Sequence, residues 1–232
     1  MLQQVLYPYG SAIVLYVNLS ISLLNFLIIM ERPVAKVELQ TVESLTPIFA
    51  FDLSSRTFEL EKAKLAVNEL QISNPEKRTS NVYSEWLSPK NSHQLNPNLL
   101  PLCNLALDIT NQVWVDIFSG GEGNFRDDFY IWQCWSIVYG QGGYAASHNH
   151  FPSFFSCVIY LEADNVSAPI VFGKNEARPA IQNAMYLFPG ILQHEVPENK
   201  GRRIAVAMNI LKKNPDKINW DNLLYNPVVE NI

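Results

Sequence analysis

The chain has 232 residues, of which 48% are apolar, and its formal net charge is −5. This length and composition suit one domain with a substantial core. The acidic charge is spread without a run or tail, so the basic footprint of a protein that binds duplex nucleic acid is absent and we expect no such partner. The odd, widely spaced set Cys103, Cys134 and Cys157 contains no CxxC motif. Cys134 and Cys157 lie in strand-like apolar runs, so we expect them to be reduced, buried thiols, and the set as a whole indicates a cytoplasmic location.

The N-terminal part contains nineteen residues without charge, from Ala12 to Met30. A helix of that length spans a bilayer, but polar residues interrupt it and no Lys or Arg precedes it. Two interpretations stay open. Residues 1–30 are an apolar extension of a chain that natively begins at Met30, or residues 12–30 are a weak membrane anchor. Any membrane contact is expected through residues 12–30 alone.

Residues 31–125 are predicted to hold an N-terminal strand and supporting helices. The strand is expected within 38–52. One helix is predicted from a cap at Ser54-Ser55 to Gln71, and a second over 101–115 with proline in its first turn. The apolar face of the first helix comprises Leu60, Ala63, Ala66, Val67 and Leu70. The polar, turn-rich stretch 75–97 is predicted to be a loop.

Residues 126–212 are predicted to form the core of the domain. Short apolar runs at 153–161, 169–173, 184–190 and 203–210 are separated by turn residues. This pattern is typical of a small antiparallel barrel or a double-sheet jelly roll. Trp132 and Trp135 lie three apart, so on a regular strand they face opposite sides and one of them is a candidate to line a pocket. Residues 213–232 read as a polar C-terminal tail.

Three of the four histidines have the spacing of a metal site. His148 and His150 are two apart, so on a strand both rings project from one face. His194 follows 44 residues later, which leaves room for a few short strands and a return to the same place. Imidazole is the commonest metal ligand in proteins. An H-x-H pair alone is more often structural or superficial, but the strands around this pair favour a site; His93, in a polar stretch, is expected outside it.

The segment from about Trp135 to Ile210 resembles the iron- and 2-oxoglutarate-dependent oxygenases. It is most similar to an uncharacterised bacterial and phage branch with an H-x-H-P-x-S…S-G-V-x-Y-L signature, a later F-P…H and a closing R-I-x-x-x-x-N-I. The matching residues are His148, His150, Ser153, Ser156, Val158, Tyr160-Leu161, Phe188-Pro189, His194, Arg203-Ile204 and Asn209-Ile210. The resemblance implies a mainly β fold with supporting helices, the double-stranded β-helix, which is a jelly roll or cupin-like barrel.

The resemblance also implies an activity and its cofactors. It predicts a dioxygenase that hydroxylates a substrate with Fe(II) and 2-oxoglutarate, the iron being held by His148, His150 and His194. In the family a basic residue nine or ten positions after the last histidine holds the distal carboxylate of 2-oxoglutarate. Arg203 is nine after His194. A planar guanidinium grips a carboxylate with two hydrogen bonds.

Strand alternation separates Arg203 from its neighbour Arg202. Arg203 shares a face with Ala205, Ala207 and Asn209, whereas Arg202 shares the other with Ile204, Val206 and Met208. Small residues beside Arg203 leave space for a ligand. Arg202 is expected at a solvated strand end.

The chain departs from the family pattern at four places. His150 stands where the wider superfamily has Asp or Glu, which removes a negative charge from the site. Ala205 replaces a Ser or Thr that contacts the cosubstrate, and we expect Tyr139 or Tyr160 to take over that contact. Phe151 and Cys157 replace a Pro and a Gly, which we interpret as packing variation.

Two other classes of function stay open. A cupin-like metal-binding protein without 2-oxoglutarate chemistry also suits three neutral histidines. A structural jelly roll, such as a capsid or adhesin component, would carry them incidentally. We expect the substrate to be a small molecule or a protein. No sequence motif distinguishes between the two.

Overall fold

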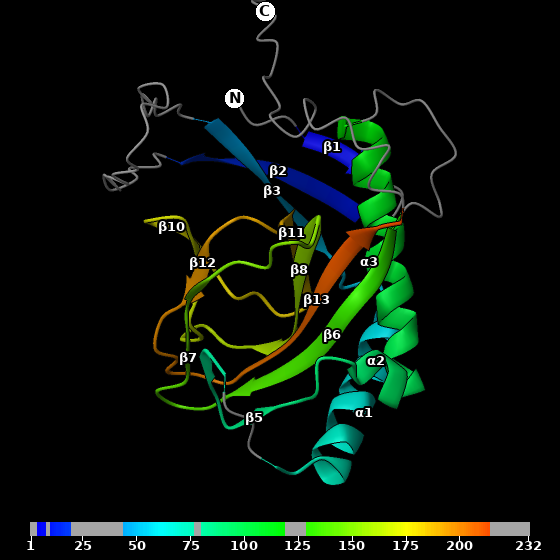
Figure 1. The fold of residues 1–232 in the computed structure, drawn as a ribbon, viewed down its shortest axis with the longest axis vertical. Helices are drawn as coiled ribbons and strands as arrows, with labels where there is room; N and C mark the ends of the chain where they lie inside the picture. Colours follow the sequence, from blue (N-terminus) through cyan, green and yellow to red (C-terminus); the bar gives the residue numbers. More distant parts are fainter. Residues whose placement is uncertain (1–3, 8–9, 20–43, 77–79, 119–128, 214–232) are drawn as a thin grey trace, which may run out of the picture.

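The computed structural model describes residues 4–7, 10–19, 44–76, 80–118 and 129–213. Two antiparallel sheets face each other, and two long helices cover the outer side of the larger sheet (Figure 1). The larger sheet has the order β1 (Gln4–Tyr7), β2 (Gly10–Leu19), β3 (Ser44–Asp52), β11 (Ala184–Pro189), β8 (Phe155–Ala163), β13 (Arg203–Lys212), β6 (Phe129–Tyr139), β5 (Trp86–Leu87). The smaller has the order β10 (Glu176–Arg178), β9 (Ile170–Phe172), β12 (His194–Val196), β7 (Tyr144–His148), β4 (Val82–Tyr83).

Helix α1 (Thr57–Ser73) buries the apolar face that the sequence predicts. Its buried residues are Leu60, Ala63, Ala66, Val67 and Leu70. The predicted serine cap is wrong, because Arg56 precedes the helix and no side chain caps it. The backbone N–H of Ser54 instead donates to Oδ1 of Asp52 at 2.8 Å, an Asx turn that ends β3 before the helix begins.

The second long helix, α3 (Leu100–Val113), continues into a wider helical turn at Trp114–Phe118. Side chains of α1 and α3 pack with one face of the larger sheet in the main core, which includes Ile204, Val206 and Met208 of β13. Ala205 and Ala207 belong instead to two smaller clusters between the sheets. The predicted alternation along β13 is therefore confirmed, and its small residues face the space that holds the candidate site.

The prediction of a loop over 75–97 is wrong in the part that the structure describes. It contains β4, β5, the single turn α2 (Ser92–Leu95) and the start of a 3₁₀ turn at Pro97–Leu99. β4 pairs with β7 in the smaller sheet and β5 with β6 in the larger. Two-residue strands are too short to show alternation, so periodicity does not reveal them. This segment passes from one sheet to the other.

The N-terminal residues 10–19 form β2, which pairs with β3 from Ala12↔Phe51 to Leu19↔Ser44. Residues 20–43, within which the predicted start of the strand and part of the apolar extension fall, lie outside the described residues, as do residues 119–128 and the tail after Lys213. Within the described ranges, no helix is both long and apolar enough to cross a membrane. Cys134 and Cys157 are buried free thiols, as predicted, and Cys103 is buried and free as well.

Candidate functional site

His148, His150 and His194 converge between the sheets. His148 ends β7, and His194 begins β12 directly opposite it in the register of the smaller sheet. The ring centroids are 4.4 Å apart for His148–His194 and 4.9 Å for both pairs with His150. The candidate ligand atoms all lie within 4.8 Å of one another, only slightly more than twice a metal–nitrogen bond of about 2.0–2.1 Å. One ion therefore fits among the three rings once their nitrogen atoms move slightly inward.

The expectation that both residues of the H-x-H pair lie on a strand is wrong for His150. Strand β7 ends at His148, and His150 lies in the following turn. Its backbone N–H donates to the carbonyl of Gly190 at 2.7 Å, which holds this turn against the β11–β12 connection. The third ring is thus placed by a loop contact and not by strand alternation.

Backbone carbonyls orient two of the rings. Nδ1 of His148 lies 2.7 Å from the carbonyl oxygen of Ala146, and Nδ1 of His194 lies 2.9 Å from that of Leu192. A carbonyl only accepts, so each Nδ1 carries the proton and each Nε2 presents a lone pair. Metal-ligating histidines are commonly oriented by a contact of this kind. The fourth histidine, His93, lies on α2 outside the cluster.

The environment keeps all three rings neutral. Burial lowers the pKa of His194 to about 4 and that of His150 to about 2, with further lowering by the neighbouring histidines. Burial also lowers the pKa of His148, and the charge of Lys90 lowers it further. Neutral imidazole is the form that binds a metal ion. The cluster is therefore ready to bind metal at neutral pH without first losing protons.

Arg203 is a buried cation close to this cluster. It is 1% exposed, and its guanidinium carbon lies 4.5 Å from the ring centroid of Tyr139 and 5.0 Å from that of Tyr160. One Nη donates to the hydroxyl of Tyr160 at 3.3 Å, while Nε has no hydrogen-bond partner. No carboxylate among the described residues pairs with Arg203. Burying a guanidinium with an unsatisfied N–H destabilises the folded chain, and an anionic ligand would accept a hydrogen bond from that N–H.

Arg203 remains charged in spite of its burial. Burial by itself lowers the pKa of Arg203, but Tyr160 and Tyr139 raise it by more, so that the pKa lies above its ordinary value. Burial raises the pKa of both tyrosines, which therefore remain protonated hydroxyls. The tyrosines named from the sequence thus lie against Arg203.

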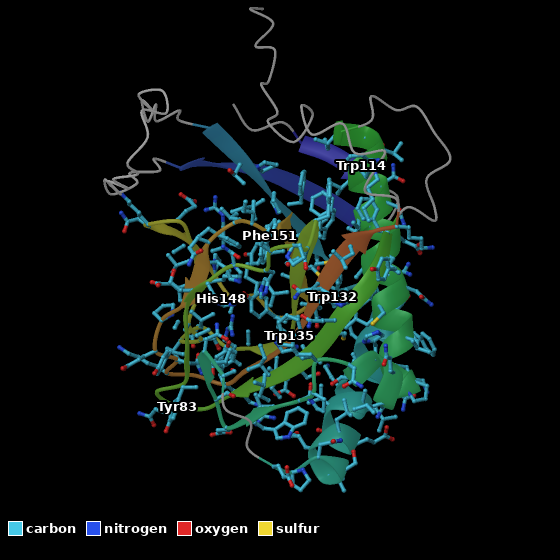
Figure 2. The ribbon with its side chains drawn as sticks, viewed as in Figure 1. Tyr83, Trp114, Trp132, Trp135, His148 and Phe151 are labelled. Atoms are coloured by element: carbon cyan, nitrogen blue, oxygen red, sulfur yellow. The ribbon has the colours of Figure 1, made fainter. Side chains whose placement is uncertain are left out.

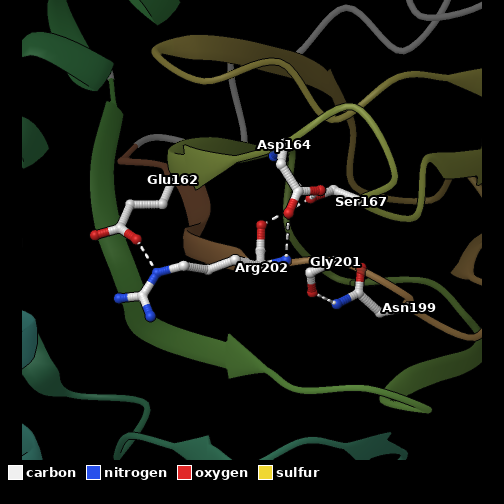
Figure 3. Close-up of polar contacts among 6 residues, drawn as sticks. All are labelled: Glu162, Asp164, Ser167, Asn199, Gly201 and Arg202. Carbon is white, nitrogen blue, oxygen red and sulfur yellow. Dashed lines mark hydrogen bonds and ion pairs between the residues drawn. The ribbon is translucent and has the colours of Figure 1, made fainter.

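Arg202 points away from the site, as predicted. Its side chain is 70% exposed and pairs with Glu162, and its backbone N–H donates to Asp164 at 2.8 Å. Its carbonyl accepts from the hydroxyl of Ser167 at 2.7 Å. Figure 3 shows this surface turn, in which the guanidinium of Arg202 pairs with Glu162.

The three histidines and Arg203 line one cavity of about 250 Å³. Apolar side chains from both sheets enclose it, among them Ile137, Val158, Ile170, Phe188, Val196 and Ala207. Figure 2 labels His148 beside β7 and Trp135 beside β6, the strands that contribute to its two walls. Of the two tryptophans, Trp135 lines the cavity and Trp132 is 42% exposed, so they do face different environments.

The sequence did not reveal the cavity residues that come from segment 80–90. Lys90, Ser80 and Asn81 line the cavity from this segment. The polar composition of this segment predicts a loop, but the residues at the mouth of a cavity have the same composition. The short strands β4 and β5 bring them to the site.

Comparison with known proteins identifies the fold. No protein-family model and no curated protein matches the sequence. Among solved structures, the carbocyclase SnoK from nogalamycin biosynthesis, described as non-heme and α-ketoglutarate-dependent, is 10% identical with a TM-score of 0.55, covering 70% of this chain and 78% of SnoK. The fold is a double-stranded β-helix.

Two further solved structures share this fold. HygX from Streptomyces hygroscopicus, whose structure holds nickel and 2-oxoglutarate, is 9% identical with a TM-score of 0.51, covering 72% of this chain and 83% of its own. A prolyl hydroxylase from Trichoplax adhaerens is 12% identical with a TM-score of 0.51, covering 72% and 84%. Identities this low establish the shared fold and leave activity to be argued from the site itself.

Proposed function

We propose that the protein is an Fe(II)- and 2-oxoglutarate-dependent dioxygenase that hydroxylates a substrate. The observation that carries the proposal is the pairing, in one cavity, of a neutral three-histidine cluster with a buried arginine whose Nε is unsatisfied. A metal site explains the histidines, and a bound carboxylate explains the arginine. A 2-oxo diacid, which chelates a metal at one end and carries a carboxylate at the other, explains both.

The residues present fit these groups. His148, His150 and His194 would hold iron, and Arg203 with the hydroxyl of Tyr160 would hold the distal carboxylate of 2-oxoglutarate. When bound, iron and 2-oxoglutarate supply the oxidative decarboxylation that activates dioxygen for attack on a substrate C–H bond. The protein's part is to fix geometry. The carbonyls of Ala146 and Leu192 hold two imidazoles, Tyr139 and Tyr160 hold the guanidinium, and the apolar walls exclude water.

A neutral ligand set distinguishes this site from the usual two histidines and one carboxylate. The same three histidines suit zinc, or iron without a 2-oxo acid, so a cupin-like protein is the competing candidate. Arg203 favours the oxygenase. In a metal-binding protein without an anionic cosubstrate, no ligand would compensate a buried guanidinium that has no carboxylate partner among the described residues.

The test combines metal content with succinate release. Purified protein is loaded anaerobically with Fe(II), its bound metal is measured, and succinate formation from 2-oxoglutarate is followed after air is admitted. His148→Ala and His194→Ala are expected to lose both metal and succinate formation, while His93→Ala, a histidine outside the cluster, retains both. Bound metal without 2-oxoglutarate binding would favour the cupin-like function, and absence of metal would favour a structural jelly roll.

His150 needs its own variants. His150→Asp recreates the common ligand set and is expected to bind iron, whereas His150→Ala is expected to bind it at least tenfold more weakly, about 1.4 kcal/mol. Unchanged iron affinity in His150→Ala would show that two histidines suffice.

A further inference from the structure

The cavity has an excess of positive charge. Among the described residues that line it, the ionised side chains are Lys90 and Arg203, and no Asp or Glu is present. The three histidines are neutral and therefore leave the charge of a bound divalent ion uncompensated. His150 contributes a neutral ring and no negative charge, so nothing in the lining of the cavity cancels this excess.

The charges can be balanced group by group, on the basis of the proposed function. Fe(II) and Arg203 together carry three positive charges, and 2-oxoglutarate carries two negative ones. One positive charge remains in the enclosed part of the site, and Lys90 adds another at its edge. An unbalanced charge in a low-dielectric cavity attracts an anion, because the attraction there is screened far less than in water. After the cosubstrate has bound, the site still favours a negatively charged group.

Lys90 is placed to receive that group. Its carbonyl accepts from the backbone N–H of Cys134 at 2.8 Å, which fixes the segment between β5 and α2 against β6. Its Nζ lies 5.6 Å from the ring centroid of Trp135, and the same ring lies 5.6 Å from that of His150. One aromatic ring thus contacts both Lys90 and a candidate metal ligand. Lys90 has no ion pair among the described residues and is exposed.

The two cations of the cavity differ in what they suit. Arg203 is buried and held by two tyrosines, so its planar fork fits one fixed carboxylate. Lys90 is an exposed ammonium on a flexible stem, which binds as a point charge and adapts to carboxylate or phosphate alike. Neutral polar groups of Ser80 and Asn81 line the cavity from the same segment. Lys90 therefore lies where a substrate entering from solvent would meet it.

We propose that Lys90 binds an anionic group, a carboxylate or a phosphate, of the substrate, so that the enzyme acts on a negatively charged small molecule whose reacting carbon extends past Trp135 toward the histidines. The proposal rests on the function proposed above and adds the chemical class of the substrate. Lys90 is a binding residue in it, and the reacting atoms lie beyond its reach.

Binding of small anions tests the proposal without turnover. Protein loaded with Zn(II) and saturated with 2-oxoglutarate, which occupies Arg203, is titrated with acetate and separately with inorganic phosphate, and tryptophan fluorescence is recorded. We expect saturable binding of at least one anion, weakened about tenfold in Lys90→Met and retained in Lys90→Arg. Lys174→Met, which removes an exposed lysine that does not line the cavity, is the matched control and should bind as the parent does.

The outcomes separate this proposal from the one on which it rests. Binding of phosphate alone indicates a phosphate ester as substrate, and binding of acetate alone indicates a carboxylic acid. If 2-oxoglutarate binds but neither anion does, or if Lys90→Met binds them as the parent does, the role of Lys90 is disproved and the oxygenase function stands. If 2-oxoglutarate itself fails to bind, the proposed function fails first.

A substrate screen provides a second measurement. Succinate release above the substrate-free rate is measured with pools of anionic, neutral and cationic small molecules. We expect stimulation by an anionic pool, with a KM raised more than kcat is lowered in Lys90→Met. Stimulation by neutral or cationic compounds alone would overturn the proposal.

Discussion

At the scale of single residues, Arg203 and Arg202 provide the most direct test of the cosubstrate. A charge-assisted contact to an enclosed carboxylate is worth roughly 1.5–3 kcal/mol. Arg203→Ala should therefore weaken 2-oxoglutarate binding about tenfold to over a hundredfold, while metal binding stays nearly intact. Arg202→Ala removes only a surface pair with Glu162 and should change it little. The measurement is a 2-oxoglutarate titration of each variant with Fe(II) under anaerobic conditions; equal losses at both positions would contradict the observed register of β13.

The neutral histidines make the stability of the metal-free protein depend on pH. Burial holds the pKa of His194 at about 4 and that of His150 at about 2 in the folded chain, below the value of about 6.5 expected in the unfolded chain. The unfolded chain thus binds more protons below about pH 6.5. The stability that the two neutral rings retain is therefore fully present above about pH 6.5 and is lost as pH falls toward 4 for His194 and toward 2 for His150.

Urea unfolding of metal-free protein at pH 7.5 and 5.0 measures this effect. The parent should lose more stability between these two values than a His150→Gln/His194→Gln variant does, because carboxylates titrate alike in both. An equal loss in parent and variant would mean that the histidines do not carry the pH dependence.

The sequence predicted which histidines and which arginine lie together in the cavity better than it predicted the contacts that hold them there. Alternation along one long strand is local, so Arg203 was separated correctly from Arg202. The position of His150 depends instead on a hydrogen bond to Gly190, forty residues away, which no local pattern encodes. Lys90 was missed for the same reason, since its relation to Trp135 arises only when β5 pairs with β6.

At the scale of elements, the connection between β11 and β12 supports the turn that carries His150. A Cβ added at Gly190 would overlap the backbone oxygen of Ser153, and backbone yields less readily than a side chain. The carbonyl of Gly190 accepts the N–H of His150, so any shift there moves this ring. Gly190→Ala should therefore weaken metal binding as well as stability.

Gly201 offers a matched control for this variant. The three atoms nearest to a Cβ there all belong to the side chain of Asp164, in the surface turn of Figure 3. Gly201→Ala should cost some stability but leave metal affinity unchanged, as measured by competition with a chelator of known affinity. Equal metal affinity in the two variants would show that Gly190 does not position His150.

At the scale of the whole molecule, the question is whether the metal site needs the N-terminal strands β1 and β2. β2 lies between β1 and β3, and β3 also pairs with β11 on its other side. A chain beginning at Met30 therefore keeps β3 in the sheet, and its metal content should equal that of the full chain, while its urea midpoint falls because β3 becomes an edge. Loss of metal from this shortened chain would show that residues 1–29 belong to the working fold.

The two halves of the site belong to different sheets. His148 and His194 lie on the smaller sheet, and Arg203 lies on the larger. Facing sheets pack about 10 Å apart, and this spacing is set by the whole core, not by any one side chain. On the proposed function, this spacing limits the length of a diacid that could bridge the metal and the guanidinium. Oxaloacetate, one methylene shorter, and 2-oxoadipate, one longer, should each bind more weakly than 2-oxoglutarate, and trimming a side chain on either sheet should not exchange their order.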